Sequence, residues 1–194
     1  MEALSRLVAA PAWQTACWLS LAGLFAFALK SKLEDLDAFV ATVSNYRILP
    51  EMLVRPGALA VVGGEILVVA GLLFPATRPA AAGLAVALLA LFAGALAINL
   101  VRGRRSIDCG CFRSALRGRI GWSQVIRNML LAGAAATLVV APAPSTVTIG
   151  DVLVGVAGAC SLVVLLLAHS FLAFDPPLER SASEPLGAEG GRSA

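Results

Sequence analysis

Residues 80–101 read AAAGLAVALLALFAGALAINLV, a run without a single charged side chain. A helix needs about 20 predominantly apolar residues to cross the hydrocarbon core of a bilayer. Four further runs have a similar length and character, at about residues 13–29, 57–74, 122–140 and 152–174. Because a segment in lipid must satisfy its own backbone hydrogen bonds, each run is predicted to form a spanning helix. We therefore expect an all-α, polytopic membrane bundle.

The overall composition supports a lipid environment. The chain has 194 residues, of which 59% are hydrophobic and only 14% are charged, whereas soluble domains carry about 25% charged residues. The core of a single soluble domain could not bury this excess of apolar residues, so the surrounding solvent is expected to be lipid. We expect an integral membrane domain over residues 1–174. Residues 175–194 lack apolar content and are predicted to form a disordered tail.

The run at 80–101 is followed directly by a polar loop, RGRRSIDCGCF at residues 102–112. Cys109 and Cys111 lie in this loop, separated by one glycine. Basic residues in short loops between spans chiefly set topology or meet lipid headgroups, so no nucleic-acid partner is expected. The arginines around the cysteines are Arg102, Arg104, Arg105, Arg113, Arg117 and Arg119.

The Cys109–Cys111 pair is suited to thiol chemistry. Nearby arginines stabilise the thiolate form of cysteine, and a Cys-Gly-Cys disulfide closes a small, strained ring that is easier to reduce than a structural bridge. Two thiolates also suit Cu(I) or Zn(II), but a full zinc site needs about four ligands. We expect no resident metal and no cofactor. Cys17 and Cys160 lie in apolar runs and are expected to be small core residues.

The side of the membrane that carries the cysteine loop is not settled by the sequence. With five spans, this loop shares one side with residues 30–56 and the tail. The bias of lysine and arginine toward this side predicts a cytoplasmic loop. Disulfide chemistry instead favours the extracytoplasmic side.

Two ionisable residues lie within predicted spans. From the expected span starts and a rise of 1.5 Å per residue, Glu65 lies about 12 Å deep and Arg127 about 8 Å deep on the cysteine side. Charged groups inside a bilayer are usually paired or functional. We therefore expect Glu65 and Arg127 to form an ion pair that supports the cysteines, or one that only holds the helices together.

Residues 30–56 are amphipathic. Their apolar residues recur at helical spacing, with acidic residues opposite, which predicts a short helix in the membrane interface that ends before Pro50. These apolar residues are Leu33, Leu36, Phe39, Val40 and Val43.

Small residues at three- and four-residue or wider helical spacing predict close contacts between spans. Gly64 and Gly71 form one such pair in the run at 57–74. Ala90 and Gly94 form another in the run at 80–101.

From residue 26 to residue 140 the chain resembles the methylamine utilisation protein MauE family, within the wider DoxX-like group. The family usually has glycine where this chain has Arg113. The resemblance rests on KSKL at 30–33, Phe39, NYRILP at 45–50, Glu65, NLVRG at 99–103, IDCGCF at 107–112, Trp122 and RN at 127–128.

The resemblance implies a four-helix DoxX-like core plus a fifth transmembrane helix, in the cell (inner) membrane. It also implies a role in maturing the disulfide-rich small subunit of methylamine dehydrogenase. We expect a membrane thiol–disulfide protein in which Cys109 and Cys111 are the redox pair, with Glu65 and Arg127 supporting them. A thioredoxin-like protein and a disulfide-containing client are its expected partners.

Two alternatives stay open. The thiols could serve a metal or small-molecule carrier, or the chain could be a non-redox assembly factor whose cysteines only staple the loop. The sequence leaves undecided whether the chain is an enzyme of the thiol–disulfide oxidoreductase type in its own right.

Overall fold

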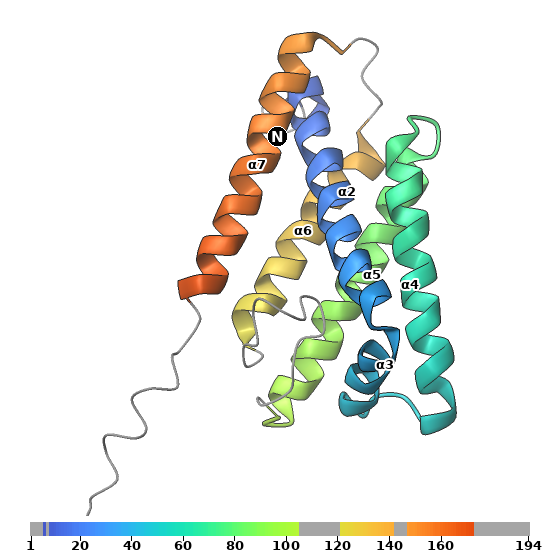
Figure 1. The fold of residues 1–194 in the computed structure, drawn as a ribbon. Helices are drawn as coiled ribbons and strands as arrows, with labels where there is room; N and C mark the ends of the chain where they lie inside the picture. The colour runs from blue at the N-terminus through green and yellow to red at the C-terminus, as the bar shows by residue number, and fades with distance from the viewer. Residues whose placement is uncertain (1–5, 7, 105–120, 142–146, 173–194) are drawn as a thin grey trace, which may run out of the picture.

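The computed structural model describes residues 6, 8–104, 121–141 and 147–172 (Figure 1). In this part of the chain, the regular secondary structure is helical, as predicted. Four of its helices, α2, α4, α5 and α6, are long and apolar enough to cross a membrane. The helices are α2 (Pro11–Glu34), α3 (Leu36–Asn45), α4 (Glu51–Leu73), α5 (Arg78–Val101), α6 (Trp122–Val140) and α7 (Ile149–Leu172).

The long helices form a bundle in which α5 packs most extensively along α6. Helix α4 contacts α2, α3 and α5, while α7 runs beside α2 at the edge of the bundle (Figure 1). The main core joins α2, α4, α5 and α6 through buried residues that include Leu21, Val68, Leu89 and Ala135. Helix α7 corresponds to the fifth expected span, which stays a prediction. The expected tail at 175–194 lies outside the described residues.

Helix α2 extends beyond its apolar run. Its buried side includes Leu21, Phe25, Ala28 and Lys32, at helical spacings of four, three and four residues. The lysine therefore continues the stripe that faces the bundle interior. Asp35 then leaves the helical conformation, with a φ of −151° and a ψ of 83°, and its side chain accepts a hydrogen bond of 2.9 Å from the backbone N–H of Ala38. This N-cap begins α3 in a new direction.

The short amphipathic helix predicted in residues 30–56 is α3, but its apolar face contacts protein. Phe39 is buried in a cluster with Ala58 and Val62 of α4. The prediction that Leu33 belongs to the same face is wrong, because Leu33 lies in α2 and is 57% exposed. Helix α3 therefore lies across the end of the bundle against α4.

Close contacts between α4 and α5 occur at one of the two predicted pairs of small residues. A Cβ atom at Gly71 would lie 2.7 Å from the Cβ of Ala81, and one at Gly64 would lie 3.3 Å from Leu88. The expectation for Ala90 and Gly94 is wrong, because Ala90 is exposed and a Cβ at Gly94 would meet nothing within 4 Å. Spacing alone did not distinguish the face of α5 that meets α4 from the face that points outward.

Helix α7 begins at a reciprocal cap. The backbone N–H of Thr148 donates to Asp151 Oδ2 at 2.9 Å, and the backbone N–H of Asp151 donates to Thr148 Oγ1 at 3.2 Å. Farther along α7, a Cβ at Gly155 would lie 2.6 Å from Thr15 of α2. This glycine therefore permits the close approach of α7 to α2.

Candidate functional site

A buried ion pair lies between α2 and α4. Lys32 Nζ is 2.7 Å from Glu65 Oε1, and the two side chains are only 2% and 0% exposed. At this distance the contact is a charge-assisted hydrogen bond, which is stronger than a neutral one. Because both groups are removed from solvent, the contact is not screened by salt as a surface pair would be.

Two aromatic rings enclose the Lys32 ammonium. Its Nζ lies 5.2 Å from the ring centre of Phe39 on α3 and 5.6 Å from that of Phe92 on α5. Both distances are within the range at which a ring face attracts a cation. Lys32 therefore joins α2 to α3, α4 and α5 at one point of the interior.

The prediction that Glu65 forms an ion pair with Arg127 is wrong. Glu65 is paired with Lys32, and its second oxygen, Oε2, has no hydrogen-bond partner among the described residues. The physical reason is the order of the helices around the bundle. Helix α4, which carries Glu65, packs beside α2, whereas α6, which carries Arg127, packs mainly on α5. Arg127 has interactions of its own and is half-buried.

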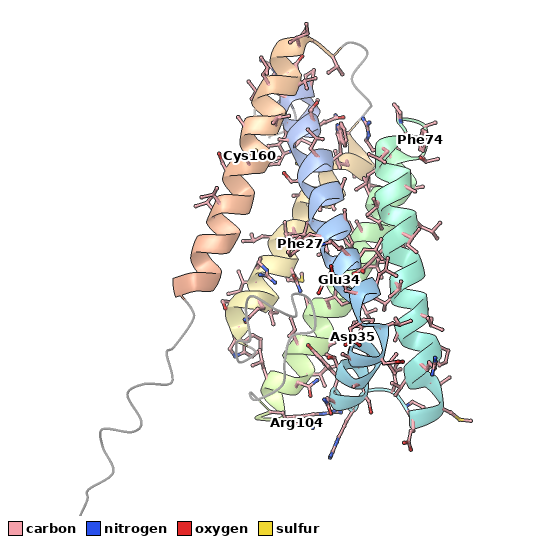
Figure 2. All side chains as sticks on the ribbon, in the orientation of Figure 1. Phe27, Glu34, Asp35, Phe74, Arg104 and Cys160 are labelled. Carbon is pink, nitrogen blue, oxygen red and sulfur yellow. The ribbon has the colours of Figure 1, made fainter. Side chains whose placement is uncertain are left out.

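Cys109 and Cys111 lie outside the described residues, but both roots of their loop are described. The described chain continues past the end of α5 to Arg104 and resumes at Gly121, the N-cap of α6. Figure 2 shows Arg104 at the end of the bundle that carries Asp35 and α3, and Phe74 at the opposite end. Both roots of the loop therefore lie toward the α3 end of the bundle.

The root at α5 has a defined local structure. The backbone N–H of Gly103 donates to the Leu100 carbonyl at 3.0 Å, and that of Arg104 donates to the Asn99 carbonyl at 3.0 Å. Gly103 has a φ of 73°. This is a Schellman motif, which needs a left-handed residue after the helix and explains the glycine in the NLVRG segment.

A second contact ties this root to the corner between α3 and α4. Arg102 Nη1 donates to the carbonyl of Arg47 at 3.2 Å. Arg47 has a φ of 48°, a conformation that non-glycine residues rarely adopt. The corner and the base of the cysteine loop are thus joined by a charged donor.

The bundle interior contains two buried asparagines, Asn99 of α5 and Asn128 of α6. Asn99 Nδ2 donates to the carbonyl of Ala95 at 3.0 Å. Among the described residues, Asn99 Oδ1 and Asn128 Nδ2 have no hydrogen-bond partner. A buried polar atom without a partner costs about 1–3 kcal/mol. These two amides therefore place polar atoms inside the bundle near the ends of α5 and α6 that carry the roots.

The other two cysteines have different surroundings. Cys17 is 7% exposed and belongs to the main core, as expected. The expectation for Cys160 is wrong, because this residue is exposed on α7 (Figure 2). The helix lies at the edge of the bundle, so apolar character does not imply an internal position there.

Four spanning helices and a buried ion pair define a polytopic membrane protein of the helical-bundle class. The chain belongs to the methylamine utilisation protein MauE family, whose sequence model matches residues 9–141.

Curated relatives cover most of the chain. The methylamine utilization protein MauE of Paracoccus denitrificans is 40% identical over 159 residues, which cover 80% of this chain and 84% of the relative. That of Methylorubrum extorquens is 40% identical over 170 residues, covering 86% and 90%. That of Methylophilus methylotrophus is 38% identical over 158 residues, covering 79% and 82%. No solved structure matches the chain.

Proposed function

We propose that this chain is a membrane thiol–disulfide protein of the methylamine utilisation system. In this proposal, Cys109 and Cys111 form a reversible disulfide that assists the maturation of a disulfide-containing client. Membership of the MauE family and the names of the relatives support the pathway. The observation that carries the chemistry is the Cys-Gly-Cys sequence, in a loop whose two roots lie at one end of a membrane bundle.

The loop root supports this chemistry in two ways. Arg102 and Arg104 place positive charge at the base of the loop, and cations favour the thiolate that attacks a disulfide. The Schellman motif and the contact of Arg102 with Arg47 also hold the base in one geometry. A loop fixed at its base can present its thiols to a partner protein without disturbing the spans.

The proposed step is a two-electron exchange. One client thiol attacks the Cys109–Cys111 disulfide and forms a mixed disulfide with one loop cysteine, which frees the other as a thiol. The second client thiol then attacks the client sulfur of this mixed disulfide, so that the client gains a disulfide and the loop becomes a dithiol that has taken up both protons. A thioredoxin-like protein in its disulfide form then accepts the two electrons and restores the loop. The small ring of the Cys-Gly-Cys disulfide favours this exchange because its strain raises the reduction potential.

Complementation of a deletion strain tests the proposal. Cys109→Ser and Cys111→Ser should each abolish growth on methylamine while leaving the amount of membrane-inserted protein unchanged. Cys17→Ala should retain growth and is the matched control. Alkylation before and after reduction should show a disulfide in the wild type that both serine variants lack. Normal growth of the Cys109→Ser, Cys111→Ser double variant would exclude the redox role.

A chain with a single remaining cysteine tests the side of the membrane on which the loop lies. We place it on the extracytoplasmic side of the inner membrane, because disulfides form in oxidising compartments. In a chain with Cys17→Ala, Cys160→Ala and Cys111→Ser, a membrane-impermeant maleimide should label Cys109 in intact cells. Labelling only after the cells are broken would place the loop in the cytoplasm, as the charge bias alone predicts.

A further inference from the structure

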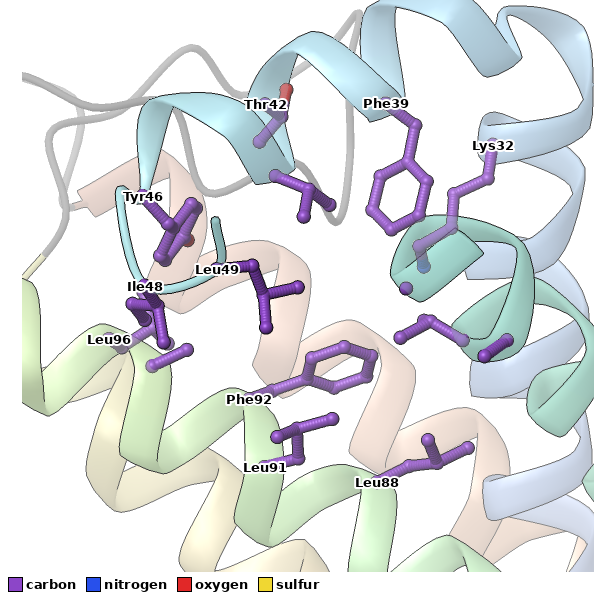
Figure 3. A pocket seen from close by; sticks show the side chains of 15 residues that line it. Lys32, Phe39, Thr42, Tyr46, Ile48, Leu49, Leu88, Leu91, Phe92 and Leu96 are labelled. Carbon is purple, nitrogen blue, oxygen red and sulfur yellow. The ribbon is translucent and has the colours of Figure 1, made fainter. Parts of the chain in front are cut away.

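A cavity of about 400 Å³ lies between α3, α4 and α5 (Figure 3). Its wall is almost entirely apolar and includes Leu88 and Leu96 of α5. Two of its lining residues, Leu49 and Leu91, are 39% and 55% exposed, so the cavity opens at the outer surface of the bundle. That surface faces lipid in a membrane protein. Cavities of about 300–1,000 Å³ are of the size that bind small molecules.

Lys32 is the charged residue in the wall of this cavity. An ammonium group has three N–H donors, and within the described residues its hydrogen-bond acceptor is Glu65 Oε1. The side chain is 2% exposed, so its other donors are shielded from bulk water. A buried donor of this kind gains a full charge-assisted hydrogen bond from any acceptor that enters the cavity.

The charge of the site limits the acceptor. Glu65 already neutralises Lys32 at 2.7 Å. A carboxylate in the cavity would leave a net negative charge in a low-dielectric interior, which is strongly unfavourable. A neutral carbonyl accepts the hydrogen bond without this cost. The rings of Phe39 and Phe92 line the cavity beside the ammonium and offer apolar surface to the body of such a molecule (Figure 3).

We propose that this cavity binds a neutral, lipid-soluble molecule whose carbonyl oxygen accepts a hydrogen bond from Lys32. Quinones and glyceride esters share this chemistry, with a carbonyl on an apolar body, and both are soluble in membranes. The proposal does not depend on the thiol–disulfide role of the cysteine loop. It assigns a function to Lys32, a buried charged residue that takes no part in the chemistry proposed for the cysteine loop.

Binding to the purified full-length protein in detergent micelles tests the proposal. The probes are a decyl-substituted benzoquinone, a short-chain diacylglycerol and decanoate, each followed by equilibrium dialysis. One of the two neutral probes should bind saturably at one molecule per chain. Whether this probe is the quinone or the diacylglycerol shows which class of molecule supplies the carbonyl. Decanoate at neutral pH should bind at least tenfold more weakly. Equal binding of decanoate, or no saturable binding of either neutral probe, would overturn the proposal.

Two variants place the binding in the cavity. Ala95→Phe fills the cavity and should weaken binding at least tenfold, whereas Ala90→Phe lies on the exposed side of the same helix and should leave binding unchanged. Lys32→Met combined with Glu65→Gln removes the donor without leaving a lone charge. This double variant should weaken binding about tenfold, the factor that roughly 1.4 kcal/mol provides.

Unchanged binding by Ala95→Phe, in protein that remains monodisperse, would show that the probe binds elsewhere. The Cys109→Ser, Cys111→Ser variant should bind the probe as the wild type does. That comparison separates failure of the cavity proposal from failure of the proposed thiol–disulfide function.

Discussion

Removal of Lys32 should be among the most destabilising single changes in the chain. Lys32→Met leaves the Glu65 carboxylate without its 2.7 Å partner at a position that is 0% exposed. Breaking a buried pair by removing one partner costs about 3–5 kcal/mol, because the remaining charge is uncompensated. Methionine has nearly the volume of the lysine stem, so the loss reports the charge and not a cavity. The variant also loses the contacts of the Lys32 ammonium with the rings of Phe39 and Phe92, which should destabilise the protein further.

A second change should recover most of this loss. Lys32→Met with Glu65→Gln removes both charges, and replacement of a buried pair by neutral residues is often close to neutral in stability. The free energy of unfolding would be measured by titrating detergent-solubilised protein with a denaturing detergent and following helix content. Since Lys32→Met alone should cost about 3–5 kcal/mol and the double change little, the coupling of the two positions in this double-mutant cycle should be at least about 3 kcal/mol.

The chain supplies its own control in an exposed pair on the same helix. Lys30 and Glu34 are 3.1 Å apart, but their side chains are 72% and 63% exposed. Such a pair contributes only about 0.3–0.5 kcal/mol, so Lys30→Met should be nearly silent. The reasoning fails if Lys32→Met costs no more than Lys30→Met, or if the losses at Lys32 and Glu65 simply add.

Three further predictions follow from local geometry. Gly71→Ala should separate α4 from α5 and lower the free energy of unfolding by about 1–3 kcal/mol. Gly63→Ala is the control and should be neutral in thermal melts, because its Cβ would meet nothing within 4 Å. Gly103→Ala should cost about 1 kcal/mol because it forces a side chain into the left-handed conformation, and equal melting of this variant and the wild type would contradict that. Hydrogen bonds from Thr148 lower the pKa of Asp151, so their stabilisation is present above the ordinary pKa and lost as pH falls through the lowered value. Thr148→Val should therefore raise the pKa of Asp151, as a carboxyl NMR titration would show, and an unchanged titration would refute the cap.

The spans could be predicted because their signal is local. A run such as residues 80–101 has the length and composition that a bilayer requires, and no knowledge of its neighbours is needed. The existence of helix α3 and the Gly71 contact followed from periodicity in the same way. The outward position of Cys160 did not, because an apolar helix in lipid is apolar on every face.

The partner of Glu65 could not be found from depth alone. A rise of 1.5 Å per residue gives the height of a side chain along a helix but not which neighbour its helix has. Lys32 was missed for a second reason, since the apolar run of the first span ends at Leu29 although the helix continues to Glu34. The spacing of Leu21, Phe25 and Ala28 contained the missing signal, because Lys32 is the next position on that face.

The order of the two charged helices has a consequence for biosynthesis. Lys32 is synthesised 33 residues before Glu65, which at about 5–20 residues per second is a delay of roughly 2 to 7 seconds. During this interval the first span has a lysine without its counter-ion. That lysine is close enough to the end of α2 to remain at the headgroups until α4 emerges from the ribosome. The buried Lys32–Glu65 pair can therefore form only after α4 has been made, so α2 cannot complete its packing before the second span is present.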